Sequence, residues 1–237
     1  MRKWRNRWLP AAGLAVLPLA AAGQGFLDFN VYPYLSDVDS DAVFTLNIAS
    51  KLEGRWSYFS LLNLYNQPAT AELSETSAYY TEQNLRWQIR EASAFDLSIQ
   101  HNMRSGDDND RLRLGLRWRL NDSAPLQAAL AALNLRYALT LHALQIDDRD
   151  ESVWQLEHSF RFTFPALSDR LYLAGFIDHT FNETLPDGFP ANPVVAELQL
   201  GWRLRGELYA VSEYRLNQYR RQDVNNLALG LQYRLPF

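Results

Sequence analysis

An arginine-rich stretch is the first candidate for chemistry. Residues 111–119 read Arg-Leu-Arg-Leu-Gly-Leu-Arg-Trp-Arg, so arginine occupies every second position apart from Gly115. A spacing of two residues places side chains on one face of a β-strand, with the apolar residues on the other face. Guanidinium groups grouped in this way can hold carboxylates, phosphates or polar rings through several N–H donors. The stretch therefore predicts an anion-binding face.

A second group of residues could perform acyl transfer. Folding the segment of His142 against the next segment brings His142 level with Glu157, and Ser159 lies one step further along the same face. The following hairpin places Asp178 opposite Gln155. Ser159, His142 and one of the two acids could then act as nucleophile, base and orienting acid. The alternative is a structural cluster, because no recognisable nucleophile motif surrounds Ser159.

The elements that carry these residues share one pattern. Apolar and polar side chains alternate in twelve segments, and this period of two predicts β-strands. About ten residues are enough for a tilted strand to cross a bilayer. We place the segments at 26–34, 43–52, 55–66, 78–90, 94–104, 110–120, 134–146, 152–164, 169–181, 193–205, 207–217 and 226–237.

The connections between these segments alternate in length. Long or polar connections occur at 35–42, 67–77, 105–109, 147–151, 182–192 and 218–225, and short turns lie between them. This alternation is typical of an antiparallel up-and-down transmembrane β-barrel of about 12 strands, with short turns on the periplasmic side. One expected turn is too long, because 121–133 contains Pro125-Leu-Gln-Ala-Ala-Leu-Ala-Ala-Leu133. We interpret 125–133 as a short amphipathic periplasmic helix, with a misassigned strand as the alternative.

In such a barrel the polar face of each strand must point into the lumen, because a charge on the lipid face at mid-depth costs roughly 2–4 kcal/mol. The pore-lining residues predicted in this way are Arg86, Arg111, Arg113, Arg117, Arg119, Arg136, Glu82, Glu157, Glu197 and Glu213. They favour a narrow electropositive channel. A network of arginines and acids that fills a small lumen remains the alternative.

Aromatic residues support the same topology. Trp56, Trp87, Trp118 and Trp202 fall at one end of their segments and on the apolar face, whereas Trp154 falls at the other end. Aromatic rings gather at the two interfaces of a membrane, so this distribution predicts two girdles.

The amino-terminus has the composition of a secretory signal peptide over 1–22, with a basic start, an apolar run and Ala20-Ala21-Ala22 before the expected cleavage site. The barrel would then span 23–237 as one domain. Removing this segment leaves 19 of the 23 basic residues against 27 acidic ones, which argues against nucleic acid as a partner. The chain has no cysteine, so disulfides and cysteine metal sites are excluded. We expect no metal site and no cofactor.

The final strand, 226–237, ends on the aromatic Phe237 and resembles the closing strand of Gram-negative outer-membrane barrels. That resemblance implies the barrel-assembly machinery as a partner, reading the terminal aromatic. Residues 195–200 (Val-Ala-Glu-Leu-Gln-Leu), 206–214 (Gly-Glu-Leu-Tyr-Ala-Val-Ser-Glu-Tyr) and 217–221 (Asn-Gln-Tyr-Arg-Arg) also resemble the nucleoside-specific channel (Tsx-like) family. This second resemblance implies a twelve-stranded barrel with a channel-like role, and it carries over no binding residues.

The sequence thus predicts an outer-membrane channel for small polar or anionic solutes, surrounded by membrane lipid and lipopolysaccharide. Two alternatives stay open at this point. The first is a hydrolase of lipid or lipopolysaccharide, phospholipase-like or deacylase-like, and the second is a non-conducting structural barrel.

Overall fold

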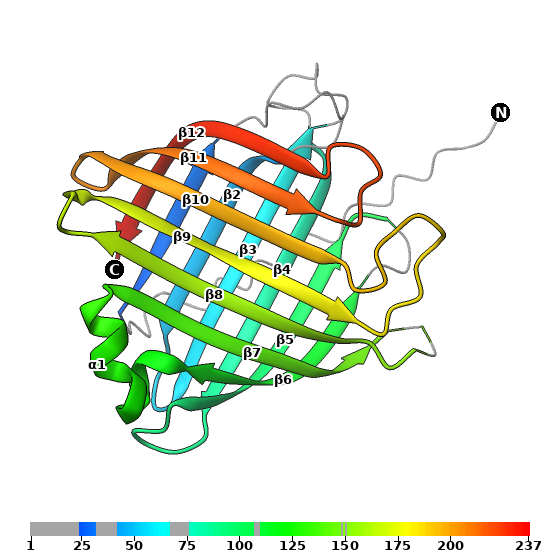
Figure 1. Cartoon of the computed structure of the whole chain (residues 1–237), viewed down its shortest axis with the longest axis horizontal. Helices are drawn as coiled ribbons and strands as arrows, with labels where there is room; N and C mark the ends of the chain where they lie inside the picture. The colour runs from blue at the N-terminus through cyan, green and yellow to red at the C-terminus, as the bar shows by residue number, and fades with distance from the viewer. Residues whose placement is uncertain (1–23, 32–41, 67–75, 107–109, 148, 150) are drawn as a thin grey trace.

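The computed structural model describes residues 24–31, 42–66, 76–106, 110–147, 149 and 151–237. These residues form an antiparallel barrel of twelve strands in which every strand pairs with its sequence neighbours and β1 pairs with β12 (Figure 1). The strands are β1 (Gly25–Val31), β2 (Ala42–Lys51), β3 (Trp56–Asn66), β4 (Thr76–Gln88), β5 (Phe95–Arg104), β6 (Arg111–Arg119), β7 (Leu135–Ile146), β8 (Trp154–Phe164), β9 (Ser168–Phe181), β10 (Val194–Arg205), β11 (Leu208–Asn217) and β12 (Asn225–Pro236). The predicted fold class is confirmed, and the expected signal peptide lies outside the described residues.

The barrel closes between its first and last strands. Leu27 pairs with Leu235, and Asn30 pairs with Gln232. The closure extends to the last residue, because the Gly25 and Phe237 backbones exchange two hydrogen bonds of 2.9 and 3.0 Å. The chain terminus is therefore part of the seam that removes both free strand edges.

The two ends of the barrel differ. At one end, turns 52–55, 89–94, 165–167 and 206–207 join neighbouring strands, and we call this the short-turn end. At the other, the long-loop end, the structure describes the connections 182–193 and 218–224, and 147–153 apart from residues 148 and 150 (Figure 1). The remaining expected long connections, 35–42, 67–77 and 105–109, fall wholly or partly outside the described residues.

A helix, α1 (Ala124–Ala132), occupies the expected long connection at the short-turn end, after a 3-10 turn over Leu120–Asp122. Ser123 precedes it, and the Trp118 indole donates to the Ser123 hydroxyl at 2.6 Å. The amphipathic character expected for it is wrong, because the helix carries no charged residue and none of its residues is buried. No helix in the described part of the chain is long and apolar enough to span a membrane.

Side chains alternate between the outer surface and the lumen. On β12, Leu227, Leu229 and Leu231 are 43–56 % exposed at the outer surface, whereas the intervening Ala228 is buried. Most of the large fully buried side chains are polar, such as Gln100, Asn84 and His142. The barrel is therefore apolar outside and polar inside, as expected for a wall between lipid and a polar lumen.

Both predicted aromatic groups are present on the outer surface. Trp56 and Trp87 contact each other at the short-turn end, with ring centroids 6.3 Å apart. Trp118 stacks on Phe95 at the same level, at 5.9 Å. At the long-loop end Trp154 stacks on Phe181 at 4.0 Å. Cross-strand ring pairs of this kind hold neighbouring strands together and also mark the membrane interfaces.

Candidate functional site in the barrel lumen

A hydrogen-bonded network occupies the middle of the lumen. Arg113 on β6 donates from Nη1 to the Gln100 Oε1 on β5, and from Nε to the Gln145 Oε1 on β7, both at 2.8 Å. The Gln100 side-chain nitrogen lies 3.4 Å from Glu157 Oε2 on β8. The His142 Nε2 lies 3.2 Å from the same Glu157 oxygen. Four adjacent strands thus contribute to one buried network.

The charges at this level are mixed. Glu157 also faces Arg86, with Nη2 and Oε1 4.0 Å apart. Glu82 accepts hydrogen bonds from Asn84 at 2.7 Å and from the Tyr80 hydroxyl at 3.2 Å. Arg113 differs from Arg86, because its acceptors, Gln100 and Gln145, are uncharged amides and no described carboxylate pairs with it. Its positive charge is therefore not neutralised by direct ion pairing.

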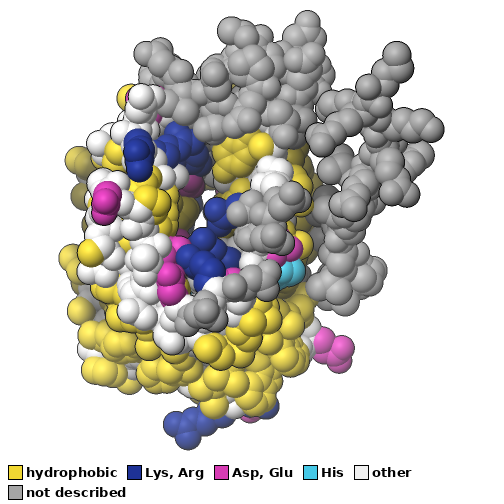
Figure 2. Space-filling model, turned by 90° about the vertical axis from the view of Figure 1, so that its right-hand side faces the viewer, with side chains coloured by type: hydrophobic (Ala, Val, Ile, Leu, Met, Phe, Trp, Pro, Cys, Tyr) yellow, Lys and Arg dark blue, Asp and Glu magenta, His cyan; other side chains and the backbone are white. Residues whose placement is uncertain are grey.

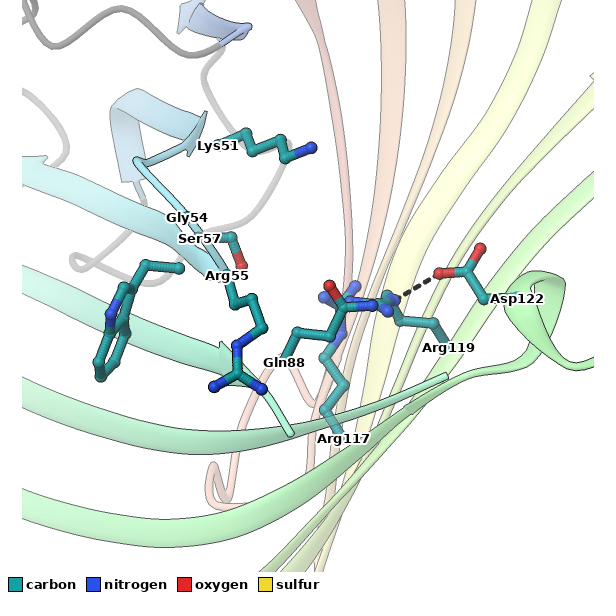
Figure 3. A pocket seen from close by; sticks show the side chains of 9 residues that line it. Lys51, Gly54, Arg55, Ser57, Gln88, Arg117, Arg119 and Asp122 are labelled. Carbon is teal, nitrogen blue, oxygen red and sulfur yellow. Dashed lines mark hydrogen bonds and ion pairs between the residues drawn. The ribbon is translucent and has the colours of Figure 1, made fainter. Parts of the chain in front are cut away.

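The short-turn end of the lumen contains a cationic cavity of about 420 Å³ (Figure 3). Lys51, Arg55, Arg117 and Arg119 line it together with Asp122. Arg119 forms ion pairs of 2.6 Å with Asp96 and with Asp122, and Arg117 lies 3.6 Å from Asp96. The basic residues at this cavity outnumber the acids that pair with them.

At the long-loop end, loops fold over the mouth and are joined through Glu183. Its side chain is 1 % exposed and accepts from Arg149 Nη1 at 2.5 Å, from the Tyr219 hydroxyl at 2.5 Å and from Arg111 Nη2 at 3.4 Å. Arg149 also pairs with Asp147 at 2.8 Å. Figure 2, which faces this end, shows basic and acidic side chains gathered around a hollow in the molecule. We call Glu183, Arg149, Tyr219, Arg111 and Asp147 together the loop clamp.

The ionisation of the loop clamp follows from these contacts. Burial works against the charged form of Glu183, but the hydrogen bonds from Tyr219 and Arg149 and the charge of Arg111 hold its pKa below the ordinary value. Burial and the hydrogen bond to Glu183 raise the pKa of Tyr219 to about 12. At neutral pH the carboxylate therefore accepts and the phenol donates.

The loop clamp is continuous with the middle of the lumen. Gln145 accepts from Arg113, and its side-chain nitrogen donates to Asp147 at 2.8 Å. Asp147 then accepts from Arg149, which reaches Glu183. One chain of contacts therefore runs from β5 and β6 to the loops at 182–193 and 218–224.

A separate network lies near the barrel seam. The Tyr172 hydroxyl on β9 donates to Gln199 on β10 at 2.6 Å and also contacts Gln232 on β12. The Gln232 side chain donates to Asp28 on β1 at 2.9 Å, and Gln199 donates to Asn30 at 3.1 Å. These bonds tie β1 to β9, β10 and β12 across the inside of the wall.

The remaining predicted pore residues also lie on the inner face. Glu197 on β10 forms a 2.5 Å ion pair with Arg215 on β11, and Glu213 on β11 is buried. Arg136 lies near the short-turn end, where it lines a second cavity. The polar faces expected for the strands are therefore the inner faces in the structure.

The proposed catalytic group is not assembled. His142 pairs in register with Gln155, and Glu157 pairs with Asp178, so both expected pairings are wrong by two residues. Ser159 is four residues along β8 from Gln155, which is about 13 Å. His142 contacts Glu157 through Nε2, whereas its buried Nδ1 has no hydrogen-bond partner among the described residues. A serine nucleophile needs the histidine within hydrogen-bond reach, and this geometry does not provide it.

Sequence reasoning missed two kinds of lumen residue. The register between β6 and β7 shifts at Leu114 and Gly115 and leaves Ala143 of β7 without a partner, so Gln145 faces inward as His142 does, although the two have opposite parity along β7. Glu183, Arg149 and Tyr219 lie in loops, where no strand periodicity indicates a direction. For these residues the available signal was the presence of charged and aromatic side chains near the ends of strands.

Comparisons with known proteins support the fold. No family model and no curated protein matches the chain. Among solved structures, a KdgM porin is 14 % identical, with 88 % of this chain and 98 % of that chain covered and a TM-score of 0.51. A NanC porin is 7 % identical over the same shares of both chains, with a TM-score of 0.55. The resemblance to the nucleoside-specific channels is not confirmed, and at these identities the likeness shows that the chain has the twelve-stranded barrel fold of such porins.

Proposed function

We propose that this chain forms a narrow outer-membrane channel for small polar or anionic solutes. The observation that carries the proposal is the placement of arginines along a closed barrel's inner wall, with Arg113 at mid-depth bound to neutral acceptors. A cation held without a paired carboxylate attracts anions in a confined, poorly screened space. The short-turn end would face the periplasm, as in up-and-down barrels generally.

Charge varies along the proposed path. The loop clamp contributes Glu183 and Asp147 at the long-loop end, and the middle combines Arg86 and Arg113 with Glu82 and Glu157. The short-turn end is the most basic part. Solutes would therefore pass from the long-loop end, which carries both acidic and basic side chains, to the basic short-turn end. This arrangement favours small anions and polar molecules over cations.

The porin neighbours support the choice of test solute. One solved structure is a KdgM porin in complex with disordered oligogalacturonate, with a TM-score of 0.52 to this chain. Galacturonate carries a carboxylate, the group that guanidinium forks bind well. Oligogalacturonate is therefore a suitable probe here beside simple salts.

The competing function is a non-conducting structural barrel, and the mid-lumen network of Gln100, Arg113, His142 and Glu157 favours it. A small barrel can be filled by its own side chains. A hydrolase is less well supported, because Ser159 and His142 lie apart.

Planar bilayer recording on the purified barrel separates these functions. We expect small conductance steps with a reversal potential in a salt gradient that indicates anion preference. Arg113→Gln and Arg117→Gln should each reduce that preference, whereas Arg205→Gln, an exposed arginine at the end of β10, should not. A folded barrel that gives no current in any salt would contradict the proposal, as would an unchanged preference in the Arg113 and Arg117 variants.

A further inference from the structure

A second cavity at the short-turn end has a different character from the first. It measures about 450 Å³ and is lined by Arg136 on β7, Arg161 on β8, Arg234 on β12, Thr163, and Leu130 and Ala131 of α1. No acidic residue lines it. We call it the helix pocket. Its volume is in the range of small-ligand sites.

Two of these arginines oppose each other directly. Arg136 and Arg161 are partners in the register of β7 and β8, so their side chains leave neighbouring strands at the same level. Like charges opposite each other across two antiparallel strands destabilise the pairing. An anion placed between the two guanidinium groups would remove that repulsion and accept hydrogen bonds from both.

The guanidinium groups of Arg161 and Arg234 each lie over an aromatic ring. The Arg161 Cζ lies 3.8 Å from the centroid of the Tyr172 ring, and the Arg234 Cζ lies 3.8 Å from the centroid of the Phe26 ring. Stacking uses the face of a guanidinium and leaves its N–H groups directed outward from the edge. Both arginines are therefore positioned for an acceptor without occupying their donors.

The three arginines, Arg136, Arg161 and Arg234, form no direct ion pair with an acid among the described residues. Asp28 is opposite Arg234 in register, but its carboxylate accepts from Gln232 at 2.9 Å and from Asn30 at 3.1 Å. The first cavity differs in this respect, because Asp96 and Asp122 pair with its arginines.

We propose that the helix pocket binds a small soluble anion through its carboxylate or phosphate groups. Arg136 and Arg161 hold the anion between them, Arg234 contributes from β12, and an apolar part of the ligand contacts Leu130 of α1. The inference rests on the proposed channel in one respect, since the bound anion would be a solute leaving the lumen at its cationic end.

Equilibrium dialysis with radiolabelled inorganic phosphate and citrate tests the site on the whole barrel in neutral detergent at low salt. We expect saturable binding by the wild type. The double variant Arg136→Gln, Arg161→Gln should bind about tenfold or more weakly, because each substitution removes charged hydrogen bonds to the anion. Leu130→Glu places an acid in the pocket without altering a strand, and it should abolish binding. Arg205→Gln is the matched control and should bind as the wild type does. Heat-modifiable migration on unboiled gels confirms that each variant is folded.

Absence of saturable binding, or equal binding by the double variant and the wild type, overturns the inference. Loss of phosphate binding when equimolar phosphatidylglycerol is added also overturns it, because the pocket would then hold a lipid headgroup. The measurement needs no ion current. A barrel that binds phosphate but does not conduct contradicts the proposed channel alone, whereas an anion-selective barrel without this binding contradicts the pocket alone.

Discussion

The ring of Tyr172 on β9 fills the space that a side chain at Gly201 on β10 would take. A Cβ built at Gly201 would lie 2.1 Å from the Tyr172 ring, and the two residues are partners in register. The ring therefore lies over the glycine on the inner face of β10 and brings its hydroxyl to Gln199 and Gln232. One missing side chain allows the network beside the barrel seam to form.

We expect Gly201→Ala to destabilise the folded barrel by about 1–3 kcal/mol, because the ring must move and its two hydrogen bonds are strained or lost. The temperature at which the folded band disappears on unboiled gels measures this effect. Adding Gly201→Ala to a Tyr172→Ala variant should lower its stability little further, because the ring that the new methyl group would meet is already gone. Equal unfolding temperatures for Gly201→Ala and the wild type would show that the ring adjusts freely.

The loop clamp should depend on pH. The folded-state pKa of Glu183 is below its ordinary value of 4.5, so the contribution of the carboxylate to stability is present above about pH 4.5 and is lost as the pH falls through the lower folded value. Hydrogen exchange, corrected for intrinsic rates, should therefore be faster in 182–193 and 218–224 at acidic pH than at pH 7.

Glu183→Gln should make these loops exchange faster at pH 7 and remove most of the pH dependence, since Arg149 and Arg111 lose their charged partner. The cost to the loop clamp is on the order of 1–3 kcal/mol. Glu207→Gln, an exposed residue in the β10–β11 turn, is the control. Unchanged exchange in Glu183→Gln would mean that the loops are held by other contacts.

The terminal residue should matter for closure of the barrel itself. Removing Phe237 deletes both backbone hydrogen bonds with Gly25, and it also removes a ring that lies against that glycine. We expect a lower yield of folded barrel both in cells and in detergent refolding. A loss in cells with normal refolding in detergent would instead indicate that the aromatic acts through recognition by the assembly machinery.

The cluster around Glu157 should behave as a structural one. Ser159→Ala is expected to leave folding and conductance nearly unchanged, whereas Glu157→Ala should lower stability by about 3 kcal/mol or more because Arg86 and His142 lose a buried partner. Thermal unfolding of the two variants compares these effects directly. Hydrolysis of phospholipid or lipid A by the wild type, abolished by Ser159→Ala, would contradict this expectation.

The sequence by itself determined the wall of this protein. The two-residue period of segments such as Arg111–Arg119 assigned one face to lipid and one to the lumen, because a charge on the lipid side is costly. Alternating connection lengths then indicated an up-and-down barrel, and the lack of strand character in 125–133 indicated α1. These features are local, so they can be read without knowing which strands meet.

The tertiary structure decided which side chains contact each other across the lumen. Register is set by turn geometry and by bulges, and a shift of two residues keeps the same face while changing every partner. For this reason His142 was assigned correctly to the lumen but incorrectly opposite Glu157. The loop clamp and the helix pocket also depend on the tertiary structure, because Glu183 comes from a loop and Arg234 comes from a strand far along the chain from Arg136.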